Sequence, residues 1–418
     1  MLFPDATGAV CVFASRRRLG CLRVLPLLLP VLPLCVIMAG PGTAAELTIS
    51  PLVSVSTRYQ DNIYFSKENK ESDFSTVLSP TLEVRQRDER GHLKVKAAVN
   101  TYTYAENNEL DSVDPIFSAN GAYALTPVLS VNAAGLYSID YQPDRTLTTS
   151  GLVSSKSKRE RNEESLGLDW TLSETTAIGG KASFGKILYA DERYSDTTSQ
   201  SYTIDLRHNL GRYFNETTGL IHLDYSRYDF DLSQSRSSTV AIGLTRNLNE
   251  KYSLTAWAGP SLNETSYPDY PIADVRDWGT AAHCALDGRF ERSSFNLAFT
   301  YDLAPDSYSS TSVERMAWKA DYSRRVSLDF GLGVSTSYFQ NKASGRDMLR
   351  TQDSDETSFN LSPRANYKIT DDLGMEVNYL YSILEEDDGS GDRSERNSVF
   401  LRLIWSKDFS RADLSTLF

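Results

Sequence analysis

Charged side chains recur at alternate positions in several apolar–polar runs of this sequence, so they share one face wherever such a run is a strand. Asp205 and Arg207 stand two residues apart, and so do Lys319 and Asp321. Such charges either neutralise one another or line a wet passage whose field selects solutes. Both alternatives stay open for the candidate inward positions, which are Lys94, Lys96, Asp140, Asp169, Asp205, Arg207, His222, Asp224, Arg315, Lys319, Asp321, Glu376 and Arg402.

Catalysis and metal binding find little support among these residues. His222 and Asp224 are two residues apart, so they would lie on the same face of a strand. A serine beside them would complete a hydrolase arrangement, but no motif supplies that serine. The chain's histidines, which are His92, His208, His222 and His283, lack metal-ligand spacing. The acidic segment 385–392 has the groups to hold Ca²⁺, but its spacing does not match an EF-hand, so we favour a solvated loop. We predict no enzyme activity, no cofactor and no metal.

The elements that carry these residues are predicted to be transmembrane strands. Such strands alternate apolar residues toward lipid with polar residues toward the lumen over about 9–11 residues. The runs 129–141, 295–303, 326–338 and 373–383 follow this pattern closely. A β-propeller would need four short strands in each repeat, and a soluble β-sandwich would not produce matched long-loop hairpins. We therefore predict an all-β, up-and-down antiparallel barrel of about 18 strands (16–18).

The predicted connections alternate between long and short. Long polar segments such as 60–73 and 340–356 have the character of extracellular loops, and short ones such as 88–91 and 323–326 that of periplasmic turns. The segment 144–161, rich in Ser, Lys and Arg, is the candidate for a constriction inside the barrel.

A tyrosine recurs every 34 to 48 residues, at the predicted extracellular end of each upward strand. An aromatic girdle belongs at this level of a membrane barrel. Parity assigns a lipid-facing position to Tyr59, Tyr141, Tyr225, Tyr301, Tyr338 and Tyr381. Tyr104, Tyr189 and Tyr267 have the opposite parity and would need a bulge to join the girdle.

The first 45 residues have the pattern of an export signal. Four arginines between residues 16 and 23 precede an apolar stretch at 24–38, and small residues permit cleavage after Ala45. Three prolines interrupt the stretch, which is too short for a transmembrane helix. The predicted organisation is a signal at 1–45, a barrel at 46–405 and a tail at 406–418, in which Phe409 or Phe418 would be the assembly signal.

The charge of the chain argues against a nucleic-acid partner. Removal of the signal takes away Asp5 and four arginines and changes the formal net charge from −12 to −15. Binding to phosphate backbones would require a basic face instead.

The opening hairpin carries a motif of the form Y-x-D-N-[IV]-[FY], followed by S-D-F and L-S-P. It comprises Tyr59, Asp61, Asn62, Ile63, Tyr64, Ser72, Asp73, Phe74, Leu78, Ser79 and Pro80. This opening resembles the β-barrel porin 2 family of Gram-negative outer membranes, and the segments 361–369 and 399–405 are a looser match. Members of that family often accompany exopolysaccharide secretion systems, so the resemblance implies a pore in such a machine.

The leading hypothesis is therefore an outer-membrane conduit for exopolysaccharide export. Its expected partners are outer-membrane lipid, periplasmic polysaccharide-export proteins and a polysaccharide substrate. A general or ion-selective diffusion porin is the first alternative, and a structural or adhesive barrel is the second.

Overall fold

The computed structural model describes residues 46–141, 157–192, 194–271, 273–306, 311–343, 355–387 and 393–410. The predicted export signal at 1–45, the acidic residues 388–392 and the tail residues 411–418, with Phe418, lie outside these ranges. Most of the predicted constriction at 144–161 does too, since only residues 157–161 are described.

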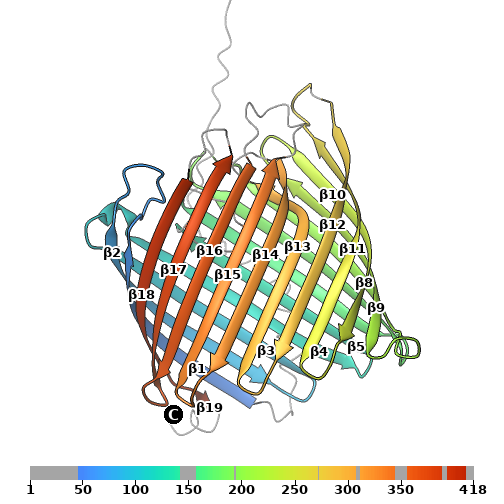
Figure 1. Cartoon of the computed structure of the whole chain (residues 1–418), viewed down its shortest axis with the longest axis horizontal. Helices are drawn as coiled ribbons and strands as arrows, with labels where there is room; N and C mark the ends of the chain where they lie inside the picture. Colours follow the sequence, from blue (N-terminus) through green and yellow to red (C-terminus); the bar gives the residue numbers. More distant parts are fainter. Residues whose placement is uncertain are drawn as a thin grey trace, which may run out of the picture.

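The described chain forms one antiparallel sheet of long strands, with a single 3₁₀ turn, η2 (Asn108–Leu110), between two of them. Figure 1 shows the strands side by side around a barrel wall. Within the described ranges, no helix is long and apolar enough to cross a membrane. The long strands are β1 (Glu46–Gln60), β2 (Asp73–Arg87), β3 (Gly91–Tyr104), β4 (Ser112–Thr126), β5 (Leu129–Asp140), β6 (Arg159–Thr171), β7 (Thr176–Tyr189), β8 (Thr197–Asn209), β9 (Thr217–Asp229), β10 (Gln234–Asn247), β11 (Tyr252–Ser266), β12 (Val275–Arg289), β13 (Ser293–Asp306), β14 (Thr311–Arg325), β15 (Phe330–Ala343), β16 (Asp355–Lys368), β17 (Leu373–Asp387) and β18 (Arg393–Ser406).

The sheet closes on itself between its first and last long strands. β1 pairs with β2 on one side, and on the other side it pairs with β18 from Leu52 opposite Ser406 to Gln60 opposite Ser398. Closure supplies hydrogen-bond partners to backbone groups that lipid could not satisfy. This closed barrel of 18 antiparallel strands confirms the predicted fold.

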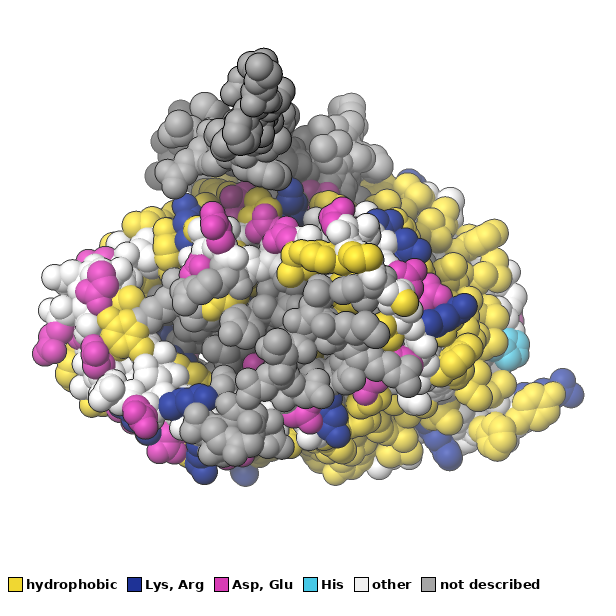
Figure 2. Space-filling view, turned by 90° about the horizontal axis from the view of Figure 1, so that it is seen from above, with side chains coloured by type: hydrophobic (Ala, Val, Ile, Leu, Met, Phe, Trp, Pro, Cys, Tyr) yellow, Lys and Arg dark blue, Asp and Glu magenta, His cyan; other side chains and the backbone are white. Residues whose placement is uncertain are grey.

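The alternation of the sequence separates two faces of the wall. Along β10 the buried Ser235, Thr239 and Ala241 alternate with the exposed Val240 and Ile242, because successive side chains of a strand point to opposite faces. Figure 2 shows hydrophobic side chains along the outside of the barrel and charged ones on its rim. The apolar face therefore lies outward, and the polar face encloses the interior.

The strands are longer than the sequence pattern predicted. They run for 12 to 15 residues, against about 9–11 for crossing the bilayer, so they extend beyond the membrane into segments expected to be loops. Part of the predicted tail also joins the sheet, since the two-residue strand β19 (Phe409–Ser410) pairs with Thr48 and Ile49 of β1.

One predicted turn is displaced along the chain. β14 continues to Arg325, and the turn occupies 326–329 instead of 323–326. The Ser327 hydroxyl accepts hydrogen bonds from the backbone N–H groups of Asp329 and Phe330, which closes the turn there. Val326 and Leu328 keep the alternation of the following strand, so the sequence period could not mark its start.

Candidate functional site

The charged residues predicted to face inward all lie on the inner face in the observed register. Residues opposite one another in neighbouring strands share a face, so the assignment can be followed from strand to strand around the barrel. Whether these residues line a conducting pore stays a prediction. The inner positions include Lys94, Lys96, Asp140, Asp169, Asp205, Arg207, His222, Asp224, Arg315, Lys319, Asp321, Glu376 and Arg402.

Most of these charges have a partner of opposite sign on the same face. Arg207 Nη2 lies 2.5 Å from Asp169 Oδ1, and Lys94 Nζ lies 2.9 Å from Glu83 Oε2. Such pairs cancel much of each other's field, so the inner face carries many charges but a small local imbalance. The remaining ion pairs of the predicted set are Arg159 with Asp140 at 3.0 Å, Arg315 with Asp302 at 3.2 Å, and Arg402 with Glu376 at 3.9 Å.

His222 and Asp224 do not form the arrangement considered for a hydrolase. His222 Nδ1 is hydrogen bonded to Asp205 Oδ1 at 2.7 Å. The Asp224 carboxylate instead accepts bonds from the hydroxyls of Thr203 at 3.0 Å and Ser226 at 2.8 Å. In the described residues, therefore, this pair does not couple a serine to the histidine.

Asp321 and Lys319 on β14 are also engaged by neighbours on the inner face. Asp321 accepts a hydrogen bond of 2.6 Å from the Ser335 hydroxyl. The Lys319 ammonium lies 5.2 Å from the centre of the Phe339 ring, a distance typical of a cation–π contact.

Lys96 and Lys181 are two inward lysines that make no ion pair with any described residue. Lys96 lies opposite Ser118 of β4 and opposite Glu83 of β2, whose carboxylate pairs with Lys94 and Arg85. Lys181 lies opposite Gly167 of β6 and Thr203 of β8. The sequence pattern does not mark Lys181 as an inward residue, because two glycines precede it and interrupt the apolar–polar alternation. The one signal for an inward position is that Lys181 and the polar Ser183 are two residues apart and so lie on the same face of the strand.

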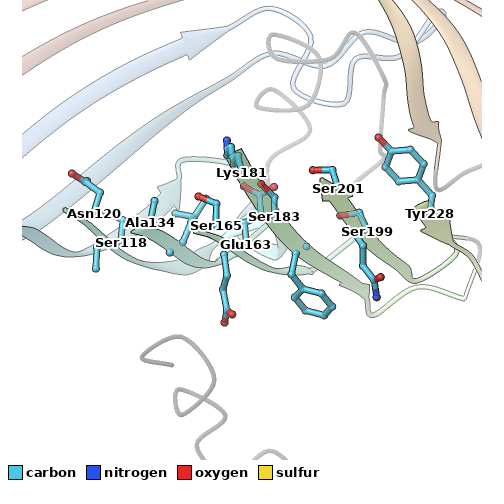
Figure 3. Close-up of a pocket in the computed structure, with 17 residues that line it drawn as sticks. Ser118, Asn120, Ala134, Glu163, Ser165, Lys181, Ser183, Ser199, Ser201 and Tyr228 are labelled. Atoms are coloured by element: carbon cyan, nitrogen blue, oxygen red, sulfur yellow. The ribbon is translucent and has the colours of Figure 1, made fainter. Parts of the chain in front are cut away.

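The inner face of β4 to β8, called here the open wall, borders a cavity of about 420 Å³. Tyr228 of β9 closes one side of this cavity. In Figure 3, Lys181, Ser201 and Tyr228 point to the same side of the sheet. The lining is rich in hydroxyl and amide groups, and its inward side chains include Ser118, Asn120, Glu163, Ser165, Lys181, Ser183, Ser199 and Ser201.

The inner faces of β10, β13 and β14 are called here the packed corner. Backbones of β10 and β14 approach within 8 Å, measured between Cα atoms, although three strands separate them in the sheet. Glycine is required beside β10, because a Cβ on Gly259 of β11 would lie 2.0 Å from the carbonyl oxygen of Val240. Small, buried inward side chains are concentrated in this corner: Ser235, Ser237, Thr239, Ala241, Ala304, Val313 and Ala317.

An aromatic stack that the sequence pattern does not predict adjoins the corner. The ring of Trp257 on β11 lies 4.4 Å from that of His222 on β9 and 5.8 Å from that of His283 on β12, both nearly parallel to it. The stack can form across β10 because the intervening residues are small, Ala241 opposite His222 and Gly243 opposite Trp257. Sequence periodicity assigns these rings to one face but does not bring them together.

Three tyrosines of the predicted girdle have outward aromatic or polar contacts near the extracellular end. Tyr59 lies against Phe74 with ring centres 4.9 Å apart, and Tyr225 stacks with Tyr202 at 6.3 Å. The Tyr301 hydroxyl donates to the Glu314 carboxylate at 2.8 Å. Of the others, Tyr338 lies opposite Trp318, Tyr381 lies opposite Leu361, and Tyr141 directly follows β5.

The three tyrosines of opposite parity do not share this outward arrangement. Tyr104 faces inward and is buried, and Tyr189 lies opposite the inward Arg159. Tyr267 is buried just beyond the end of β11. No bulge restores them to the outer face in the described strands that carry Tyr104 and Tyr189, because the ladders there run without a register shift.

The opening motif lies where the barrel closes. The Asp61 carboxylate accepts hydrogen bonds from the backbone and side-chain nitrogens of Asn397, at 2.8 and 2.6 Å. Asn62 is fully buried and donates to the carbonyl oxygen of Glu395 at 3.0 Å. The two residues therefore clasp the end of β1 to β18, more than 300 residues further along the chain.

Asp73, the second part of the motif, holds the loop between β3 and β4. Its carboxylate accepts bonds from the backbone N–H groups of Glu106 and Asn107 and from the Asn107 side chain. Burial alone would raise the pKa of Asp73, but these bonds and one from the Phe74 N–H hold that pKa below its ordinary value of 3.8. The residue lies at the extracellular rim, so this loop is tied to the start of β2.

Comparison with known structures returns outer-membrane proteins of low sequence identity. Pseudomonas aeruginosa OccK2 (OpdF), solved with glucuronate, is 10% identical with a TM-score of 0.45, covering 88% of this chain and 98% of its own. Acinetobacter baumannii OccAB4 is 12% identical with a TM-score of 0.44, covering 88% and 99%. P. aeruginosa OpdK, solved with vanillate, is 9% identical with a TM-score of 0.46, covering 88% and 100%.

Comparison of sequences gives one family. No curated protein matches the chain. The model of the family described as "Putative beta-barrel porin 2" matches residues 43–199, which include the opening motif and the strands from β1 to β7. This match confirms the resemblance found in the sequence. Over residues 43–199 the chain is therefore similar to this porin family.

Proposed function

We propose that this barrel is a passive outer-membrane channel for hydroxyl-rich solutes such as saccharides. The observation that carries the proposal is the open wall, where five serine hydroxyls and Asn120 line a cavity of about 420 Å³. Hydroxyls both donate and accept hydrogen bonds, so they can replace the water shell of a sugar without a large desolvation penalty.

The charges of the inner face support the same substrate class. Ion pairs such as Arg207 with Asp169 leave little local imbalance, so a neutral polar solute meets no strong barrier. Lys96 and Lys181 add a positive bias to this side of the barrel. We therefore expect anions to pass more readily than cations, and neutral sugars to pass as well.

A bilayer and liposome experiment tests the proposal. Purified protein should give steady conductance in planar bilayers and should let small sugars enter liposomes. Ser201→Trp would fill the cavity and lower both rates, whereas Ser238→Trp, on the outer face of β10, is the matched control and should change neither. A barrel that passes no ions and no sugars would contradict the proposal.

Export of an exopolysaccharide is the narrower form of this function. The resemblance of the opening hairpin supports it, and so does a hydroxyl-rich wall, which suits a sugar polymer as well as a small sugar. Periplasmic export proteins are the partners such a role requires, and the segment 1–45 would direct the chain through the periplasm. A deletion strain should still synthesise the polysaccharide but lack it at the cell surface. Normal surface polysaccharide in the deletion strain would exclude the export role and leave the diffusion channel as the proposed function.

A further inference from the structure

Three arginines occupy one cross-strand row on the outer face of the barrel. Arg227 of β9 lies opposite Arg236 of β10, which lies opposite Glu264 of β11, and Glu264 lies opposite Arg276 of β12. Residues opposite one another share a face, and Val240 and Ile242 show that this parity of β10 is the lipid-facing one. The arginines, together called the outer arginine row, therefore project away from the lumen.

The next row toward the membrane is aromatic and apolar. Tyr202 and Tyr225 stack there, followed by Ser238, Leu262 and Trp278, a residue that is 76% exposed. Exposed tryptophan and tyrosine mark the level where hydrocarbon gives way to headgroups. The outer arginine row consequently lies at the height of the headgroups of the outer leaflet.

The charges of the row are incompletely compensated. Arg227 pairs with Asp229 at 2.9 Å, and Arg276 pairs with Glu264 at 3.0 Å. Arg236 makes no ion pair with any described residue, and its guanidinium donates only to the neutral side-chain amide of Gln234.

Two arginines directly opposite one another repel, an arrangement that destabilises a sheet unless an anion lies between them. A phosphate is suited to this place, because guanidinium groups bind its oxygens through paired, charge-assisted hydrogen bonds. Gln200, opposite Arg227 on the other side, adds a neutral donor at the same height.

We propose that the outer arginine row binds the phosphate of a phosphorylated lipid in the outer leaflet. A lipid is favoured over a soluble anion because the row directly borders the apolar belt, so one molecule can place its phosphate on Arg227 and Arg236 and its chains against Tyr225 and Leu262. The site would fix the height of the barrel in the membrane. It is independent of what passes through the lumen.

The test uses the purified full chain in phosphatidylcholine nanodiscs with a small fraction of phosphorylated lipid A, and native mass spectrometry counts the retained lipid. The Arg227→Gln/Arg236→Gln variant should bind about 25-fold more weakly, on the basis of about five-fold for each basic residue near an anionic surface. Arg246→Gln, on the outer face at the other end of β10, is the matched control and should bind as the wild type does.

Two further measurements, with a dephosphorylated lipid and with a single-residue variant, test whether the phosphate is the group that is recognised. Dephosphorylated lipid A should bind the wild type no better than it binds the double variant, since the phosphate is the recognised group. If the double variant does not fold, Arg236→Gln alone replaces it in the binding measurement, because Arg236 is exposed and makes no ion pair with any described residue. Equal retention by wild type and Arg236→Gln, or an equal loss in Arg246→Gln, would overturn the proposal.

Discussion

The open wall and the packed corner are both built from long strands that alternate inward and outward side chains, yet their inner faces are packed differently. At the open wall the serines and Lys181 border a cavity of about 420 Å³. At the packed corner Ala241 and Ala304 are almost fully buried, and β10 approaches β14 within 8 Å between Cα atoms.

The comparison of the two regions teaches that polar inward side chains are not enough to line a cavity. The corner also contains serines, such as Ser235 and Ser237, but there the small side chains are buried and the backbones of β10 and β14 lie within 8 Å of each other between Cα atoms. The solute route that we propose therefore follows the open wall.

The largest expected effect is on stability, and it compares a buried ion pair at the rim of the open wall with a half-exposed ion pair in its middle. Asp140 and Arg159 form a pair with side chains 4% and 7% exposed, so Asp140→Asn removes the carboxylate that neutralises a buried guanidinium and should cost about 3–5 kcal/mol of unfolding free energy. Asp169→Asn breaks a pair that is about half exposed and should cost less than about 1 kcal/mol. Urea unfolding in lipid vesicles measures both. Equal costs would mean that the wall is no more open in its middle than at its rim.

Next in size, a single methyl group should distinguish the packed corner from the rest of the sheet. The Cβ of Gly259→Ala would lie 2.0 Å from a backbone carbonyl oxygen, which cannot rotate away, so we expect a loss of about 1–3 kcal/mol or more. The added Cβ of Gly180→Ala on β7 meets nothing within 4 Å and should leave stability unchanged or slightly higher. The same vesicle assay checks both variants, and a harmless Gly259→Ala would refute close packing at the corner.

A smaller effect concerns ion selectivity at the open wall. Lys181→Gln removes an unpaired inward charge, which acts on an ion 4 Å away in water with about 1 kcal/mol. The anion-to-cation permeability ratio should fall by up to about five-fold, as measured from reversal potentials in a salt gradient. Lys186→Gln, on the outer face of the same strand, is the control. Equal shifts in the two variants would show that the open wall does not conduct.

The smallest expected effect is a local dependence on pH at the rim. Because the pKa of Asp73 is lower in the folded barrel than its ordinary 3.8, its ionised form stabilises the attached loop above about pH 4. This contribution should be lost as the pH falls from about 4 through the folded pKa. Hydrogen exchange of the 105–111 amides should therefore show loosening in acid that is absent from Asp73→Asn, which should be loosened at every pH. An acid response retained by the variant would assign it to another group.

Much of the fold follows from the sequence because a strand's side-chain period of two is a local property. The alternation in 129–141 and 373–383 assigns faces to residues without reference to a partner strand, and the lengths of the connections predict the number of hairpins. The ends of strands were less predictable. At Val326 and Leu328 the alternation continues through a turn that the Ser327 hydroxyl closes.

The sequence alone thus determined the barrel, its two faces and the parity of its charged residues, since each depends on neighbours along one strand. The tertiary structure alone decided which inward residues meet water, because that depends on how sharply the closed sheet bends. It brought Trp257 between His222 and His283, and it joined Asp61 to Asn397 across the closure. Contacts between residues so far apart in the chain are set by closure of the whole sheet, and no local period encodes them.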